Sequence, residues 1–215
     1  MSTVEIVGWL GALTATLLGM PQAWRLIRTR NIEGLSLVAW QANLVINIGW
    51  TAHGIVINQW NMIIPNALAM SATLPILILM QRELGLSLFR VLLPGVLGGA
   101  AMIVVDLLAG SAAYGAVALI PALLANAGQS VALVRSPRVV GVSPGFLVTQ
   151  VINQLVWLIW AVLLPDTGTQ IAAIVTGCVA VFNLAWWLLR QFGLRAFAVR
   201  EPTADPDAAP ISFDT

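Results

Sequence analysis

The chain has 215 residues, of which 59% are hydrophobic and 9% are charged, and its formal net charge is +1. A soluble domain carries about 25% charged residues, so a water-soluble globule could not hide this much apolar surface behind so few charges. The composition therefore predicts an integral membrane protein. Its near-neutral charge argues against a nucleic-acid partner.

Residue types that the chain lacks exclude several kinds of site. There is no lysine, which rules out a retinal Schiff base and a pyridoxal enzyme. One histidine, His53, and one cysteine, Cys178, disfavour haem, zinc and iron–sulfur sites and rule out an internal disulfide framework. No Gly-rich phosphate loop is present. We therefore expect no metal site, no cofactor and no enzymatic activity.

Seven apolar stretches are each long enough for one membrane-spanning helix, since about 20 residues cross the hydrocarbon layer. They lie at residues 4–26, 35–57, 61–80, 91–110, 114–134, 143–164 and 168–190. Runs of this length favour helices over the shorter strands of a membrane barrel. The start of the chain has no basic segment and carries Glu5, so no cleavable signal peptide is expected. The tail, 193–215, is expected to be disordered.

The arginines predict how the helices are oriented. All ten basic residues are arginines, and they occur at Arg25, Arg28, Arg30, Arg82, Arg90, Arg135, Arg138, Arg190, Arg195 and Arg200. With seven spans, every one of them falls on the same side of the membrane. The positive-inside rule makes that side the cytosol, which places the N-terminus outside and the C-terminus inside.

The sequence matches itself after a shift of 107 residues, without a gap. The identities pair Gln22 with Gln129, Arg28 with Arg135, Gly34 with Gly141, Ser36 with Ser143 and Trp50 with Trp157. The pattern predicts two three-helix repeats, at 1–80 and 114–192, joined by a loop and linker helix at 81–113. An extra helix between two such repeats restores the direction of the second one, so the repeats should be parallel.

One face of the second predicted helix is polar, and the repeat preserves it in the sixth. The first face carries Ser36, Trp40, Asn43, Asn47, Trp50 and Gly54, and the second carries Ser143, Leu147, Gln150, Gln154, Trp157 and Ala161. Carboxamides facing lipid would lack partners, so both faces should point inward. Two interpretations are open: the amides link neighbouring helices, or they line a central cavity. A tryptophan beside the amides in both copies favours a cavity for a small polar ligand such as a sugar ring.

A third residue is expected at the depth of Trp50. Asn66 lies a few residues inside the third predicted helix, as Trp50 does inside the second, so both could contact one ligand. The second copy has Ala173 in place of Asn66. If the site is twofold, one side has therefore lost an amide.

Pro21, followed by Gln22, lies inside the first predicted helix. Proline removes a helix hydrogen bond and kinks the chain, so Pro21 is either a hinge or a static kink. The second copy has Gly128 and Gln129 here, and Gly128 would bend more softly.

Together these motifs resemble the PQ-loop superfamily, and among its members the SWEET and SemiSWEET (MtN3-like) sugar transporters. The resemblance rests on Pro21–Gln22, on Gly34–Leu35–Ser36, on the spacing from Trp50 to Asn66, and on two three-helix repeats around one extra helix. It implies facilitated diffusion of mono- or disaccharides by alternating access. Carried over, the pocket would be formed by Trp50, Asn66 and Trp157, with Ala173 departing from the family pattern.

Two ionisable side chains fall inside the predicted helices and are candidates for protonation. His53 is one turn beyond Trp50, and we expect a neutral ring hydrogen-bonded within the bundle. Asp106 is near the outer end of the linker helix and is expected to reach the membrane interface. Some PQ-loop relatives export amino acids with protons, a property that the resemblance ties to an acidic residue in the second PQ region. Residues 121–138 contain none, which disfavours that reading.

The sequence thus predicts an all-α integral membrane protein with seven spans in a bacterial inner membrane, in contact with lipid and able to form a homo-oligomer. Its predicted function is the movement of a small neutral sugar down its gradient. The alternatives are a proton-coupled amino-acid transporter of the PQ-loop type and a membrane receptor or assembly factor on the same fold.

Overall fold

The computed structural model describes residues 1–30, 32, 35–135 and 143–197, and the regular structure of these residues is entirely helical. The helices are α1 (Thr3–Thr29), α2 (Leu37–Val56), α3 (Trp60–Glu83), α4 (Leu88–Arg135), α5 (Pro144–Leu163) and α6 (Thr167–Gln191). Five of these helices are long and apolar enough to cross a membrane, and α2 is outside that group. The described chain is therefore an all-helical, multi-pass membrane protein.

Some predicted features lie outside the described residues. They are Gly34, Gly141, Arg138, Arg200 and most of the predicted tail, from residue 198 onward. The backbones of Pro21 and Gln22 belong to α1, but their side chains are likewise outside the description.

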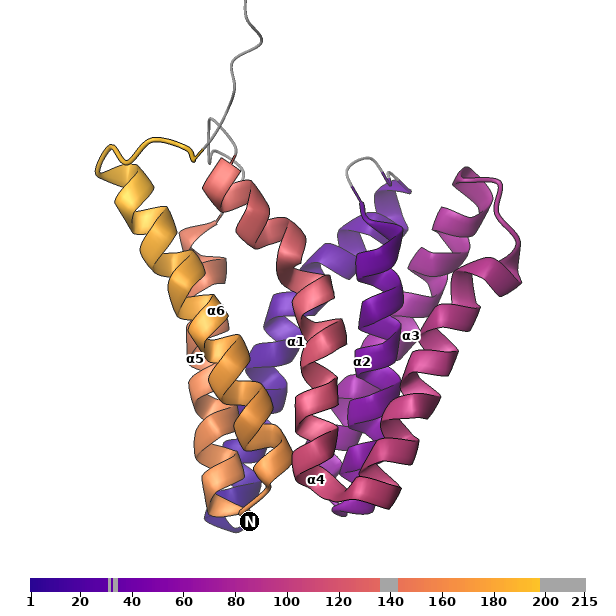
Figure 1. Cartoon of the computed structure of the whole chain (residues 1–215), viewed down its shortest axis with the longest axis vertical. Coiled ribbons are helices and arrows are strands. Elements are labelled where there is room, and N and C mark those ends of the chain that lie inside the picture. The colour runs from indigo at the N-terminus through magenta and orange to yellow at the C-terminus, as the bar shows by residue number, and fades with distance from the viewer. Residues whose placement is uncertain (31, 33–34, 136–142, 198–215) are drawn as a thin grey trace, which may run out of the picture.

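Gly110 divides α4 into two arms. It has φ 80° and ψ 175°, a backbone conformation that suits glycine and that residues with a Cβ rarely adopt. The chain turns back at this point, so residues 88–109 (the first arm) and 111–135 (the second arm) run in opposite directions (Figure 1). The two arms correspond to the predicted helices at 91–110 and 114–134.

Equivalent serines begin equivalent helices in the two copies of the repeat. Ser36 is the N-cap of α2, where its hydroxyl accepts the backbone N–H of Ala39. Ser143 is the N-cap of α5 and accepts the N–H of Phe146 in the same way. A serine at this position satisfies a backbone donor that the helix itself leaves unpaired. The repeated serine is thus explained by a shared helix start.

The helices pack in the same order in both halves of the chain. Helix α1 packs on α3 and α5, α2 packs on α3 and α4, and α6 packs on α4 and α5. The contact between α2 and the first arm is close because glycines face it. A Cβ added to Gly95, Gly98 or Gly99 would lie 2.6 Å from Leu44, Val45 or Ile48, respectively. The first arm is therefore closely interlocked with α2.

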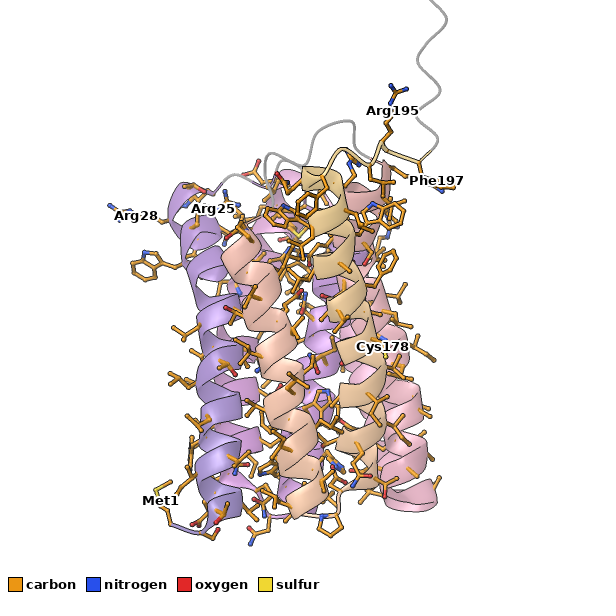
Figure 2. All side chains as sticks on the ribbon, turned by 90° about the vertical axis from the view of Figure 1, so that its left-hand side faces the viewer. Met1, Arg25, Arg28, Cys178, Arg195 and Phe197 are labelled. Atoms are coloured by element: carbon orange, nitrogen blue, oxygen red, sulfur yellow. The ribbon has the colours of Figure 1, made fainter. Side chains whose placement is uncertain are left out.

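The molecule has two distinct ends. Met1 lies at one end, whereas Arg25, Arg28 and Arg195 lie at the opposite end (Figure 2). We call these the Met1 end and the arginine end. The helices converge at the Met1 end and diverge towards the arginine end (Figure 1).

Candidate functional site

A cavity of about 980 Å³ is lined by residues from all six helices. Every residue predicted to bind substrate lies in its wall, namely Trp50, Asn66, Trp157, Asn43, Asn47, Gln150, Gln154 and Ala173. Gly128 and Gln129 also line it, whereas His53 and Asp106 do not. The structure thus brings the predicted pocket residues of both halves around one space.

The cavity reaches the arginine end and is closed at the Met1 end. Its wall includes the N-cap residues Ser36 and Ser143, which are exposed. At the other end, the indoles of both pocket tryptophans pack against a buried apolar cluster. We call this cluster, made of Met62, Trp160 and Ala161, the apolar seal. The structure is therefore open on one side only.

The wall of the cavity carries polar groups but no charged ones. Among the described residues that line it, there is no Asp, Glu, His or Arg. The polar groups are carboxamides and hydroxyls, and the indoles of Trp40, Trp50 and Trp157 add flat apolar surfaces. Such a surface can bind a neutral molecule that has hydroxyl groups and an apolar face.

The amides of the two polar faces differ in their hydrogen bonds. Some of them link neighbouring helices, and others leave polar atoms free towards the cavity. Asn47 Nδ2 donates to Thr73 Oγ1 of α3 at 3.0 Å, and Thr176 Oγ1 of α6 donates to Gln154 Oε1 at 2.8 Å. These two amides link helices within their own half. Asn66 Nδ2 instead donates to the carbonyl of Met62 in its own helix at 2.8 Å. Its Oδ1 has no protein partner in the described chain and remains able to accept a ligand hydroxyl.

Asn153 was not predicted, although it links the two halves. It is buried in the wall, and its Nδ2 donates to the carbonyl of Gly11 at 3.1 Å and to Thr14 Oγ1 at 2.7 Å. The equivalent position in the first copy is Ile46, so the repeat gave no signal for it. Asn126 and Asn183 also line the cavity from the second half and were not predicted either.

A buried cluster of ionisable side chains lies at the Met1 end, beside the apolar seal. His53 is 0% exposed, and its Nδ1 lies 2.7 Å from Asp106 Oδ2, while its Nε2 lies 3.2 Å from Asp166 Oδ2. The expectation that Asp106 reaches the membrane interface is wrong. Its carboxylate faces α2 inside the bundle, because a buried hydrogen-bond partner is available there and lipid offers none.

Asp166 was not predicted as a member of this cluster. It is the N-cap of α6, where its Oδ2 accepts the N–H of Thr169 at 3.0 Å. The hydroxyl of Ser111 in the second arm donates to its Oδ1. Burial alone would raise the pKa of Asp166, but the hydrogen bonds from His53, Ser111 and Thr169 lower it well below its usual range. An aspartate directly before a predicted helix was the available signal.

The position equivalent to His53 in the other half holds an uncharged side chain. The shift of 107 residues relates His53 to Trp160, which is also fully buried and forms part of the apolar seal. Its indole meets that of Trp157 edge to face, with ring centroids 5.4 Å apart. The Met1 end is thus closed by ionic contacts on one side and by apolar contacts on the other.

Comparison with known proteins places the chain in a family. The sequence matches no family model. It is 33% identical to a protein named sugar transporter SemiSWEET from Escherichia coli (strain UMEA 3162-1) over 79 residues, which are 37% of this chain and 89% of that protein. The chain belongs to the SemiSWEET family.

The SemiSWEET relative is a transporter, and on this kinship the chain is not an enzyme. The match covers only part of this chain. A stretch of 79 residues covers most of the relative but only about a third of this chain, which is close to the size of one predicted three-helix repeat.

Proposed function

We propose that the protein carries a small neutral sugar across a membrane by alternating access, without coupling to protons. The observation that carries the proposal is the cavity, which is open at the arginine end and closed at the Met1 end, and whose wall includes Trp50, Trp157 and Asn66. The absence of ionisable side chains among its described lining residues suits an uncharged substrate. The kinship with a SemiSWEET sugar transporter supports the same substrate class.

We further propose seven membrane spans, with the N-terminus outside and the C-terminus in the cytosol of a bacterium. At 1.5 Å per residue, the 48 residues of α4 would be about 72 Å long if straight, which is more than twice the hydrocarbon thickness. The turn at Gly110 supports counting α4 as two spans. The 20 residues of α2 would reach about 30 Å, enough for one span.

In this proposal the two halves are parallel repeats. The first repeat is residues 1–80, the linker is 81–113 and the second repeat is 114–192. The equivalent N-caps Ser36 and Ser143 and the common packing order support this division. The residues that we propose to bind the sugar are Trp50, Asn66 and Trp157, with the remaining polar wall residues around them. Bending of α1 at Pro21, and of the second arm at Gly128, would open and close the cavity.

Uptake into proteoliposomes tests this function. We expect the purified protein to equilibrate labelled mono- or disaccharides across the bilayer, without accumulating them when a pH gradient is imposed. Accumulation of an amino acid driven by a pH gradient would instead identify a proton-coupled transporter. Binding of a sugar without any flux would identify a receptor. A thermal-shift screen of neutral sugars, amino acids and polyols chooses the substrates to be tested.

A further inference from the structure

The contacts of Asp166 determine where hydrogens must lie in the buried cluster at the Met1 end. We call His53, Asp106 and Asp166 the acid–histidine cluster. Ser111 Oγ accepts the N–H of Gly168 at 2.8 Å, so the hydroxyl hydrogen of Ser111 is directed to Asp166. With that hydrogen and the N–H of Thr169, Asp166 is held as a carboxylate at the N-terminus of a helix, where an anion is favoured.

The ring of His53 must therefore donate from Nε2. A bare nitrogen 3.2 Å from a carboxylate oxygen would set two lone pairs against each other. With Nε2 protonated, two arrangements remain for Nδ1 and Asp106, which are 2.7 Å apart. Either Nδ1 carries a second hydrogen and donates to the Asp106 carboxylate, or a protonated Asp106 donates to Nδ1. Both arrangements place one exchangeable proton between His53 and Asp106.

That proton matters for the charge of a buried site. With it, the cluster holds two negative charges and one positive charge, or a single negative charge beside a neutral acid. Without it, two carboxylates would flank a neutral ring that is 0% exposed. Two like charges in a buried site with no compensating cation are strongly unfavourable. The closed Met1 end therefore requires the proton.

We propose that the acid–histidine cluster is a proton-binding site, which takes up one proton from the outside when the Met1 end closes and returns it to the outside when that end opens. The proposal rests on the Met1 end opening during the transport cycle and not on which molecule is carried. It assigns His53, Asp106 and Asp166 a role that the sugar pocket does not need.

The packing indicates which contact breaks on opening. His53 and Asp106 lie on α2 and on the first arm, which interlock through glycines and stay together. Asp166 belongs to the other half of the chain and reaches His53 across the boundary between the halves. Separation of the halves at the Met1 end would withdraw Asp166 and admit water. A histidine in contact with water loses its proton near neutral pH, so opening releases the proton.

The other groups around His53 do not replace this role. Tyr114 of the second arm stacks on the ring, with centroids 4.4 Å apart and planes at 10°, and its phenol is neutral near pH 7. Trp50 meets the ring edge-on at 5.7 Å. Helix α5 has no ionisable side chain, those of α3 are at its arginine end, and Glu5 of α1 is exposed and bonded to Ser2. The titratable groups that face His53 are thus Asp106, Asp166 and Tyr114.

The proton exchanges with one side only. None of the three residues lines the cavity, although Thr169, whose N–H binds Asp166, does. In the structure, which is open to the arginine end, the cluster is therefore separated from the cavity. External acid should hold the Met1 end closed, and the proton is not carried through with the substrate.

A distance measurement tests the proposal without any substrate. Spin labels are placed on opposite halves at the Met1 end with Trp60→Cys and Thr167→Cys, both exposed positions, in a chain that also carries Cys178→Ser. Electron–electron distances are then measured for the full chain in lipid nanodiscs from pH 5 to pH 9. One linked proton predicts that the ratio of open to closed populations rises with pH by up to about tenfold per pH unit.

Variants distinguish the effect of the acid–histidine cluster from that of the apolar seal. Asp166→Asn and His53→Gln should remove the pH dependence, because neither leaves a ring that must hold a proton between two carboxylates. Trp160→Phe is the matched control at the equivalent position of the other half. It should shift the equilibrium but keep its pH dependence. Populations that do not respond to pH, including an end that stays closed from pH 5 to pH 9, overturn the proposal.

The histidine itself gives a second readout that needs no variant. The chain has one histidine, so ¹⁵N-histidine labelling yields signals from one ring only. At pH 7 we expect Nε2 to carry a hydrogen, and Nδ1 either to carry one as well or to accept a strong hydrogen bond. A ring with a bare Nε2 contradicts the proposal even if every variant fails to fold. Neither result affects the sugar-transport proposal, which is tested by uptake.

Discussion

The indole of Trp157 in α5 lies against Gly11 in α1, so closely that a Cβ added to Gly11 would sit 2.9 Å from its Cε2 atom. The residues equivalent to Trp157 and Gly11 under the shift of 107 are Trp50 and Ala118. Trp50 packs against the buried cluster of Met102, Tyr114 and Ala118. Each indole therefore rests on the first helix of the opposite half. The walls of the cavity depend on contacts between the halves.

Replacing Gly11 by alanine should displace the Trp157 indole. Alanine favours a helix by about 1 kcal/mol over glycine, so the fold should be retained. Overpacking costs about 1–3 kcal/mol, and if it falls on the bound state it weakens sugar affinity roughly 5- to 150-fold. Titration calorimetry on the purified protein measures the change. Gly145→Ala is the control, because the nearest atom to its added Cβ is 3.7 Å away. Equal affinities for both variants would mean that the Trp157 wall does not bind the ligand.

Asn66 should supply a directional hydrogen bond that Ala173, its equivalent in the second half, cannot. Leaving a ligand group unpaired costs about 1–3 kcal/mol, so Asn66→Ala should weaken sugar binding by roughly 5- to 150-fold. Trp50→Ala and Trp157→Ala should each remove a stacking surface and slow uptake. If all three variants fold and transport at the parental rate, the pocket assignment is wrong.

The converse substitution restores the missing amide. Ala173→Asn in α6 should tighten sugar binding or shift preference towards a ligand with one more hydroxyl. Because Ala173 is buried, a thermal melt must first show that the variant is folded. Binding that is weaker for every sugar would show that the second half of the pocket has no room for an amide.

Pro21 should affect the rate of transport more than the affinity. If α1 bends there during the cycle, Pro21→Ala stiffens the helix and slows uptake, while equilibrium binding of sugar stays nearly unchanged. A static kink predicts instead that stability and binding are lost together. Parallel measurements of uptake, affinity and melting temperature distinguish these outcomes.

Cysteine labelling in intact cells tests the proposed orientation. In a chain with Cys178→Ser, a cysteine at the exposed Thr167 should react with an impermeant maleimide added outside, and one at Thr29 should not. The expectation follows from the positive-inside rule, because Thr29 directly follows Arg28, which lies at the arginine end (Figure 2). Reaction at Thr29 with none at Thr167 would invert the orientation.

Sequence patterns were sufficient to predict the helices and to group residues that line the cavity. The apolar runs confirmed as helices are long, and the repeat placed Trp50 and Trp157 on equivalent faces, so no tertiary information was needed. The acid–histidine cluster required such information. Asp106 is 53 residues from His53, and Asp166 is 113 residues from it. Their meeting depends on the turn at Gly110 and on how the halves cross, which hydropathy does not encode.

Asp106 shows why the prediction at one position was wrong. Asp106 lies near the end of a predicted helix, which is typical of a residue that reaches the membrane interface. The sequence does not indicate that His53 lies beside it. Asn153 shows the opposite limit, since its bonds to Gly11 and Thr14 across the halves have no counterpart at Ile46, the equivalent position of the first copy. Reasoning from a repeat finds what the copies share and misses what one copy has gained.

Such one-sided residues are possible because both halves lie on one chain. In a pair of identical three-helix subunits, any substitution appears twice, so a histidine at the position of His53 would also replace Trp160 on the far side. The first arm of α4 joins the two halves and removes that constraint. The two sides of the Met1 end can therefore differ: His53 with its two carboxylates lies on one side, and the apolar Trp160 lies at the equivalent position on the other.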